Sequence, residues 1–270
     1  MADLKLSAPK RLGRTVVLGY CDIGAAGVRV LEGMSGASQM TGEGACSRLR
    51  ETGREALAFS GMGAAVFDGV PALEAVHFDG EKGSAGDTDQ PSVTLLKLNT
   101  TVGQDLSASL SLSLVDLLVA RRPTLDRLII AAAVQPPKRH QIPAEAATLP
   151  PDVVCTFSCG GVDINSSPSL GSLSSLPSLP TGARIADSFL MTLVRLCRLE
   201  DVPLTVLARV GYRTTGAAAD VDGTDEAING LGQCLAQAVG LEFNSNKACG
   251  VRRSRGWKGS PSAQVVPGYI

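Results

Sequence analysis

Aromatic side chains are scarce in this chain, where they account for 4% of the 270 residues and include a single tryptophan. A core with so few rings has to be built from Leu, Val, Ile and Ala. Apolar residues make up 44% and charged residues 19% of the chain, which is typical of a globular protein. The length suits one large domain or two small ones with a substantial core.

Neither sign of charge dominates, because 25 Lys and Arg stand against 26 Asp and Glu for a net charge of −1. This balance gives no electrostatic reason to expect nucleic acid or an anionic membrane as the main partner. No apolar run approaches the ~20 residues of a membrane span, and the longest, 128–134, has the length of a buried strand. Residues 1–13 contain no apolar h-region, so we expect a flexible N-terminus and no secretory signal. Their basic, Ser- and Ala-containing composition leaves an organelle transit peptide as an open alternative.

Histidine is equally rare, with only His77 and His140 in the whole chain. Neither follows or precedes a nucleophile, so a solvated or core-satisfied histidine is the default interpretation. Seven cysteines, an odd number, are scattered through apparent strands and helices, which predicts buried thiols in a reducing compartment, the cytosol or nucleus. Cys155 and Cys159 are spaced like the start of a metal site, but no second Cys or His pair lies at ligand spacing. We therefore expect no metal and no other cofactor.

The glycine motifs favour structural interpretations. Gly61-Met62-Gly63 lacks the third glycine of a dinucleotide fingerprint, and Pro71 would break the helix that should follow. Gly19 and Gly27, with Gly24 between them, follow a strand and precede a helix, but no Gly-Lys-Ser/Thr is present to hold phosphate. A tight strand-to-helix turn explains them.

The charged motifs have simple explanations too. Arg252 and Arg253 begin a basic run that also contains Arg255 and Lys258, which could contact nucleic acid or an import receptor, although a solvated basic tail is the commoner outcome. Asp225 and its neighbour Glu226 lie at the expected start of a helix, where a solvated cap accounts for both.

The strongest periodic pattern lies in residues 181–213. Ile185, Phe189, Leu193 and Leu196 recur at spacings of four, four and three, which predicts one apolar stripe on a helix over 184–200 of roughly five turns. This helix has to end before Pro203, which disfavours the helical region for the preceding residue. The nearly continuous apolar run 204–210 then predicts a strand buried on both faces, as in a parallel sheet.

Around this unit the sequence predicts a single α/β domain over 14–243, with a mixed, mostly parallel sheet flanked by helices. Segment 105–120 has a helical period, although its inner part 110–114 alternates as a strand does. Gly240 lies where the C′ glycine of the last helix belongs. The other predicted strands are 15–21, 56–59, 64–67, 75–78, 92–98, 128–134 and 152–157; the other helices are 25–32 and 224–239; segment 33–53 is predicted as loop; and 79–91, 162–181 and the tail 244–270 are predicted to be disordered.

This order of elements resembles the proteasome assembly chaperone superfamily, and within it the proteasome assembly chaperone 1 family. The stretch RIADSFLMTLVRLCRLEDVPLTVLARVGY (184–212) is similar to that family's helix, short joint and buried strand. The resemblance covers about residues 14–240 and is specific around 182–242 and at the last three residues. It implies a non-catalytic chaperone that works as a heterodimer with a second assembly chaperone and holds 20S proteasome α-subunits while the α-ring forms.

The end of the chain carries the same resemblance. Members of the family finish in a hydrophobic residue, a penultimate tyrosine and any residue, and dock this tail on the α-ring. Here the chain ends in Gly268-Tyr269-Ile270, with the tyrosine in register and glycine at the hydrophobic position. The resemblance therefore implies that Gly268, Tyr269 and Ile270 bind the partner, with residues 244–267 as a flexible tether.

Two other functions remain open from the residues alone. An enzyme of nucleosidase or phosphorylase type has the same general α/β pattern and would need convergent His, Asp or Glu, and Arg groups at strand ends. A small-molecule-binding module would have a formed pocket without perturbed acids. The expected setting for the chaperone is the cytoplasm, with the nucleus as an alternative.

Overall fold

The computed structural model describes residues 6, 9–20, 25–36, 49–58, 66–67, 70–80, 91–100, 102–134, 153–160, 171–179, 187–211 and 221–254. The helices are α1 (Ala26–Gly33), α2 (Gln104–Val119), α3 (Gly171–Ser174), α4 (Ser188–Leu199), α5 (Val221–Val239) and α6 (Ser245–Ser254). The strands are β1 (Thr15–Tyr20), β2 (Met34–Ser35), β3 (Leu49–Ala56), β4 (Val66–Phe67), β5 (Val70–Pro71), β6 (Leu73–Gly80), β7 (Val93–Leu98), β8 (Arg127–Val134), β9 (Cys155–Cys159), β10 (Leu204–Val210) and β11 (Glu242–Phe243).

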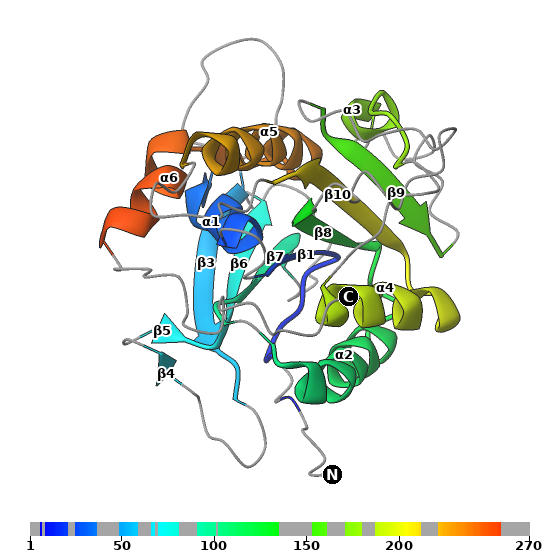
Figure 1. Cartoon of the computed structure of the whole chain (residues 1–270). Helices are drawn as coiled ribbons and strands as arrows, with labels where there is room; N and C mark the ends of the chain where they lie inside the picture. The colour runs from blue at the N-terminus through cyan, green and yellow to red at the C-terminus, as the bar shows by residue number, and fades with distance from the viewer. Residues whose placement is uncertain are drawn as a thin grey trace, which may run out of the picture.

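A seven-stranded sheet in the order β3-β6-β7-β1-β8-β10-β9 forms the centre of the molecule (Figure 1). Strands β7, β1, β8 and β10 are parallel neighbours, whereas β6 and β9 run antiparallel to them. Strand β3 pairs antiparallel with β6, so it points the same way as the central four. Most strands therefore share one direction, and the predicted mixed, mostly parallel sheet flanked by helices is confirmed.

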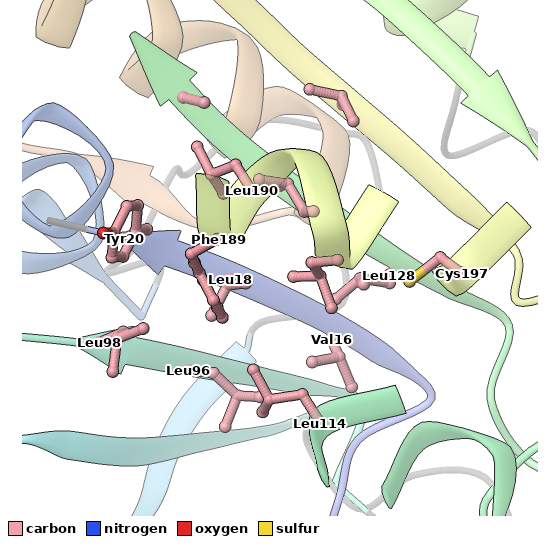
Figure 2. Close-up of a cluster of buried hydrophobic side chains, with 14 of the residues drawn as sticks. Val16, Leu18, Tyr20, Leu96, Leu98, Leu114, Leu128, Phe189, Leu190 and Cys197 are labelled. Carbon is pink, nitrogen blue, oxygen red and sulfur yellow. The ribbon is translucent and has the colours of Figure 1, made fainter. Parts of the chain in front are cut away.

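Helices cover both faces of this sheet, which is why the central strands are buried along their whole length. Helices α2 and α4 pack on one face, where Leu18 and Leu96 contribute to a core that also contains Tyr20 and Phe189 (Figure 2). The ring centroids of Tyr20 and Phe189 lie 4.9 Å apart. Helices α1, α5 and α6 cover the other face, with Val17 among the strand residues buried there.

The glycines of the β1–α1 unit are explained by this packing. A Cβ on Gly27 would lie 2.6 Å from the carbonyl oxygen of Ala131 on β8, and one on Gly19 would lie 2.4 Å from the carbonyl oxygen of Gly27. Real Cβ atoms do not come so close, so α1 can approach the sheet only because both positions lack a side chain. The interpretation of Gly19 and Gly27 as a tight strand-to-helix connection is confirmed; Gly24 and Gly61 to Gly63 lie outside the described residues.

The central helix is shorter than predicted. Helix α4 begins at Ser188 because the side chain of Asp187 accepts a hydrogen bond from the Leu190 N–H at 2.9 Å, the usual role of an N-cap aspartate. The prediction of a five-turn helix over 184–200 was wrong in its extent, since α4 spans Ser188–Leu199. At its end Asp201 adopts a left-handed conformation (φ 51°), and Val202 N–H bonds the Cys197 carbonyl, which closes the helix before β10.

Two segments predicted to lack structure are ordered at the sheet edge. Strand β3 lies partly within the predicted loop 33–53, because an edge strand with charged side chains carries no apolar pattern and becomes a strand by pairing with β6. Residues 9–13 are packed as well: Leu12 is buried, and Gly13 N–H donates to Thr94 Oγ1 at 2.7 Å. The prediction of a flexible N-terminus was therefore wrong for residues 9–13.

The predicted insertions are also smaller than expected. Asp79 and Gly80 belong to β6, where Asp79 pairs with Arg50 of β3. Within 162–181, residues 171–174 form α3, and Leu173 is buried against the core. Residues 177–179 then bond the outer edge of β9 at Thr156. That strand itself is shifted from the predicted 152–157 to Cys155–Cys159 by its register with β10. The remainder of both insertions lies outside the described residues.

The largest correction concerns the C-terminal segment. Helix α6 spans Ser245–Ser254, within the segment predicted as a tail without structure. Helix α5 starts earlier than predicted, at Val221, and ends before Gly240, whose φ of 71° confirms its role as the C′ glycine. Among the described residues, no helix is long and apolar enough to cross a membrane.

Candidate functional site

The residues that the sequence analysis singled out as the docking site cannot be placed. Gly268, Tyr269 and Ile270 lie outside the described residues, which end at Ser254. Helix α6 is the last described element before these residues. It lies within the segment predicted as a flexible tether, so its contacts with the domain show where such a tether could begin.

Arg29 of α1 holds α6 in place. Its side chain is 4% exposed, and its Nη2 lies 2.6 Å from Oδ1 of Asp225 on α5. The same guanidinium donates to the carbonyl oxygen of Ala248 at 3.2 Å and to that of Cys249 at 3.4 Å, both on α6. Arg29 therefore joins three helices, and its charge is satisfied by one carboxylate and two peptide carbonyls. The interpretation of Asp225 as a solvated cap was wrong.

The start of α6 is fixed by further contacts. Asn244 donates its N–H to the carbonyl oxygen of Gly33, and its side chain caps the helix by accepting from Lys247 N–H at 2.9 Å. Ser245 Oγ donates to Oδ1 of Asn229 on α5 at 2.6 Å. Ala248 is fully buried against α1, where a Cβ on Gly33 would lie 2.9 Å from the Ala248 methyl. Helix α6 is thus part of the domain.

On the opposite face, α2 and α4 lie side by side (Figure 1). Ser107 Oγ lies 3.0 Å from Ser188 Oγ at the start of both helices, and Arg122 after α2 donates to the carbonyl oxygens of Glu200 and Asp201 after α4. The two helices are therefore parallel to each other. The Arg122 cation also lies at the negative end of the α4 dipole, where it is stabilising.

The outer surface of this pair carries the large apolar side chains that the described residues expose to solvent. Leu112 of α2 is 51% exposed and Leu199 of α4 is 78% exposed. The same two helices also expose charges of both signs, Asp116 on α2 and Arg195 and Arg198 on α4. The sequence analysis missed this surface, although Leu112 lies two residues from the buried Leu stripe of α2 and so on its other side.

His77 does not face solvent but takes part in a buried polar chain. Its Nδ1 lies 3.0 Å from Thr94 Oγ1 on β7, and its Nε2 lies 3.0 Å from Oε1 of Glu55 on β3. Glu55 also accepts from the N–H of Lys10 at 3.3 Å. Of the two interpretations of this histidine, the core-satisfied one is confirmed. His140 lies outside the described residues.

A second polar cluster lies under α1 on the other face. Lys97 of β7 is 2% exposed, and its Nζ lies 3.4 Å from a carboxylate oxygen of Glu32 on α1 and 3.4 Å from one of Glu74 on β6. Arg54 of β3 extends the cluster to the sheet edge, at 3.6 Å from Glu74. Its hydrogen bonds hold the pKa of Glu51 below the usual range. Each of these charges is paired, as buried charges have to be.

The described cysteines are free thiols. Cys197 is completely buried, and this burial raises its pKa to about 12. Burial also raises the pKa of Cys155 and of Cys159. Thiols with raised pKa values are poor nucleophiles and poor metal ligands at neutral pH. Within the described part of the chain no group of three or more His, Cys, Asp or Glu side chains is arranged to hold a metal.

An enzyme with this topology would carry its polar groups where the parallel strands end. At that edge Tyr20 uses its hydroxyl to accept the Val102 N–H at 3.0 Å, and Asn99 donates its side-chain amide to the Pro71 carbonyl at 2.8 Å. Among the described residues, these strand ends bring together no carboxylate, histidine and arginine.

The seven-stranded mixed sheet between the α2/α4 layer and the α1/α5/α6 layer defines the class of the protein, an α/β domain with a proteasome assembly chaperone-like fold. It superposes on PbaB of Pyrococcus furiosus, described as an archaeal proteasome activator, with a TM-score of 0.53 over 94% of this chain and 96% of that chain, at 12% identity.

Two further solved structures support this assignment of the fold. PbaA of Pyrococcus furiosus, described as an archaeal homolog of proteasome-assembly chaperone, gives a TM-score of 0.50 over 93% of this chain and 87% of that chain, at 14% identity. A Thermoplasma acidophilum protein of unknown function gives a TM-score of 0.52 over 92% of this chain and 87% of that chain, at 8% identity. The sequence matches no protein-family model and no curated protein. The similarity at these identities is one of fold.

Proposed function

We propose that this protein is a non-catalytic assembly chaperone for the 20S proteasome, which acts as a heterodimer with a second assembly chaperone and promotes formation of the α-ring. The observation that carries the proposal is the superposition on PbaB and PbaA over nearly the whole length of both chains. The penultimate Tyr269 supports it by a different argument, because it is a feature of the sequence and not of the fold. The free cysteines support a cytoplasmic or nuclear location.

The second chaperone would cover the outer surface of α2 and α4. Leu112 and Leu199 are the apolar anchors of this surface, and Asp116 with Arg195 could set the orientation of a partner of the same fold. Such a partner would bring its own equivalent pair of helices. Co-expression should then give a one-to-one heterodimer, whereas this chain alone should aggregate or self-associate.

The C-terminal residues would dock on the α-ring. Because α6 belongs to the domain, a tether for these residues would consist of 255–267 and not of 244–267. The terminal carboxylate would pair with a lysine between neighbouring α-subunits, while the Tyr269 ring packs in the same groove. A desolvated carboxylate needs a cationic partner, so losing this pair should weaken docking strongly.

The test measures binding of the purified heterodimer to purified α-rings. We expect deletion of Tyr269 and Ile270, or a C-terminal tag, to weaken binding without changing the fold or the dimer. Gly268→Leu should strengthen it by restoring the apolar contact. A double variant, Leu112→Ser with Leu199→Ser, should do the reverse by separating the heterodimer while leaving the tail intact. If truncation leaves binding unchanged, the role assigned to Tyr269 is wrong.

A further inference from the structure

The C-terminal part of the chain differs from the rest in charge. Residues 244–270 contain Lys247, Arg252, Arg253, Arg255 and Lys258 and neither Asp nor Glu. Residues 1–243 therefore hold the remaining 20 basic residues and all 26 acidic ones, a net charge of −6. The chain has a net charge of only −1, but it consists of an acidic part, residues 1–243, and a basic C-terminal segment, residues 244–270.

This basic segment starts on a fixed helix. Three of its five cations lie in α6, which Arg29 and Asn244 attach to α1. Lys247 is exposed, and no carboxylate of the described residues forms an ion pair with it. Arg29 is occupied by Asp225 and two carbonyls, so it is not one of the cations available to a partner. The remaining cations follow α6 in the sequence, on the chain that leads to Tyr269.

We propose that α6 is a basic docking element, held rigidly on α1 by Arg29, that binds an acidic protein surface next to the site where the C-terminal tail docks. In its choice of partner, the α-ring, this inference rests on the proposed function. It adds a second contact, of different chemistry, and it assigns the α1/α6 side of the domain to the ring. The α2/α4 side then remains available to the second chaperone.

The position of α6 limits how far this contact can be from the tail site. Sixteen residues, 255–270, follow α6, and a fully extended chain of that length reaches roughly 50–60 Å. As a random coil the same segment spans roughly 20–24 Å. A contact made by α6 therefore lies within roughly 60 Å of the tail site and raises the local concentration of Tyr269 there.

An acidic protein fits the charge distribution better than nucleic acid does. A long polyphosphate would extend past α6 along a body of net charge −6, which repels it. The basic segment 244–270 contains two aromatic residues that could stack on a base, Trp257 and Tyr269, and they are 12 positions apart, whereas single-strand binders stack successive bases on several aromatic side chains. A folded protein can present a local acidic patch to α6 and a neutral surface to the rest.

The test compares two variants of the heterodimer that change the net charge equally. Lys247→Glu with Arg252→Glu reverses two cations of α6, and Lys10→Glu with Arg121→Glu reverses two exposed cations elsewhere. Both shift the net charge of this chain from −1 to −5. At low salt we expect the α6 variant to bind α-rings about tenfold more weakly than wild type, and the control to differ little. High salt should remove the difference.

Three outcomes separate this inference from the proposed function. Deletion of Tyr269 and Ile270 should lower the affinity but leave the low-salt difference between the α6 variant and the control in place, because the α6 cations remain. If the α6 variant binds as the control does while the truncation weakens binding, the inference is wrong and the proposed function stands. If α-rings bind none of the proteins, immobilised poly-L-glutamate tests α6 by itself, and failure of wild type to bind it more tightly than the α6 variant overturns the inference. A DNA duplex that competes better than poly-L-glutamate would identify nucleic acid as the partner instead.

Discussion

Replacing Arg29 with methionine should release α6 and destabilise the domain. The change keeps the apolar part of the side chain but removes the bond to Asp225 at 2.6 Å and those to the carbonyls of Ala248 and Cys249 at 3.2 and 3.4 Å. Removing one member of a fully buried ion pair costs about 3–5 kcal/mol. The side chain of Asp225 is 27% exposed, so water can solvate its carboxylate once Arg29 is gone. We therefore expect the free energy of unfolding to fall by about 2–3 kcal/mol.

The loss should be local before it is global. Helix α6 is attached mainly through Arg29, Ala248 and Asn244, whereas the core between the sheet and helices α2 and α4 contains no α6 residue. Amide hydrogen exchange should therefore rise across 245–254 at denaturant concentrations that leave α2 and α4 protected. Urea unfolding measures the total change in free energy.

Asp225→Asn is the matched control for this prediction. It removes the partner charge but keeps an oxygen that can accept from Arg29, so we expect a loss of about 1 kcal/mol and retention of α6. A double-mutant cycle between the two positions gives the pair energy. If Arg29→Met leaves the exchange of α6 unchanged and costs under about 0.5 kcal/mol, α6 is not held by this residue, and its role as a fixed docking element fails.

Three further predictions concern the body of the domain. Asp201→Gly should raise the free energy of unfolding by about 0.5–1 kcal/mol, because glycine adopts the left-handed conformation at φ 51° without strain; no rise in the urea midpoint would contradict this. Gly27→Ala should lower the thermal midpoint sharply or prevent folding, since its Cβ would lie 2.6 Å from the Ala131 carbonyl oxygen; circular dichroism would detect a tolerated alanine. Cys197, with its pKa raised by burial to about 12, holds its proton longer in the folded state than in the unfolded one. Its contribution to stability is therefore complete below about pH 9 and lost as the pH rises towards 12, and Cys197→Ala should flatten that alkaline decline in urea unfolding.

Periodicity made the interior of the fold predictable. Strands β1, β7, β8 and β10 are predominantly apolar, and the structure buries them on both faces of the sheet. Segment 105–120, whose pattern also suited a strand, is the helix α2 because one of its sides packs on the sheet and on α4. Leucine content alone could not decide between the two, since either element would bury the same residues.

Elements at the edge were less predictable, because their stability comes from neighbours that are distant in sequence. Strand β3 carries exposed charges and exists through its pairing with β6. Among the described side chains of helix α3, Leu173 is the buried anchor, and it lies within a Ser- and Pro-rich stretch typical of disorder. Aspartate at 187 is a recognisable N-cap signal, and attention to it would have placed the start of α4 correctly.

Of the two proposed docking elements, one could be predicted from the sequence and the other only from the tertiary structure. The terminal Gly268-Tyr269-Ile270 is a local motif, and the sequence by itself was sufficient to propose it, because the proposed docking of a chain end would need no contact with the rest of the domain. The attachment of α6 could be decided only by the tertiary structure. It depends on a cation in α1 reaching a carboxylate in α5 and two backbone carbonyls in α6, which lie 196, 219 and 220 positions further along the chain. No pattern within α6 indicates these partners. Among its described side chains only Ala248 is buried, and with its several cations the helix has the composition of a solvated tail. The hydrogen bonds that its carbonyls accept from the buried Arg29 help to hold it on the domain.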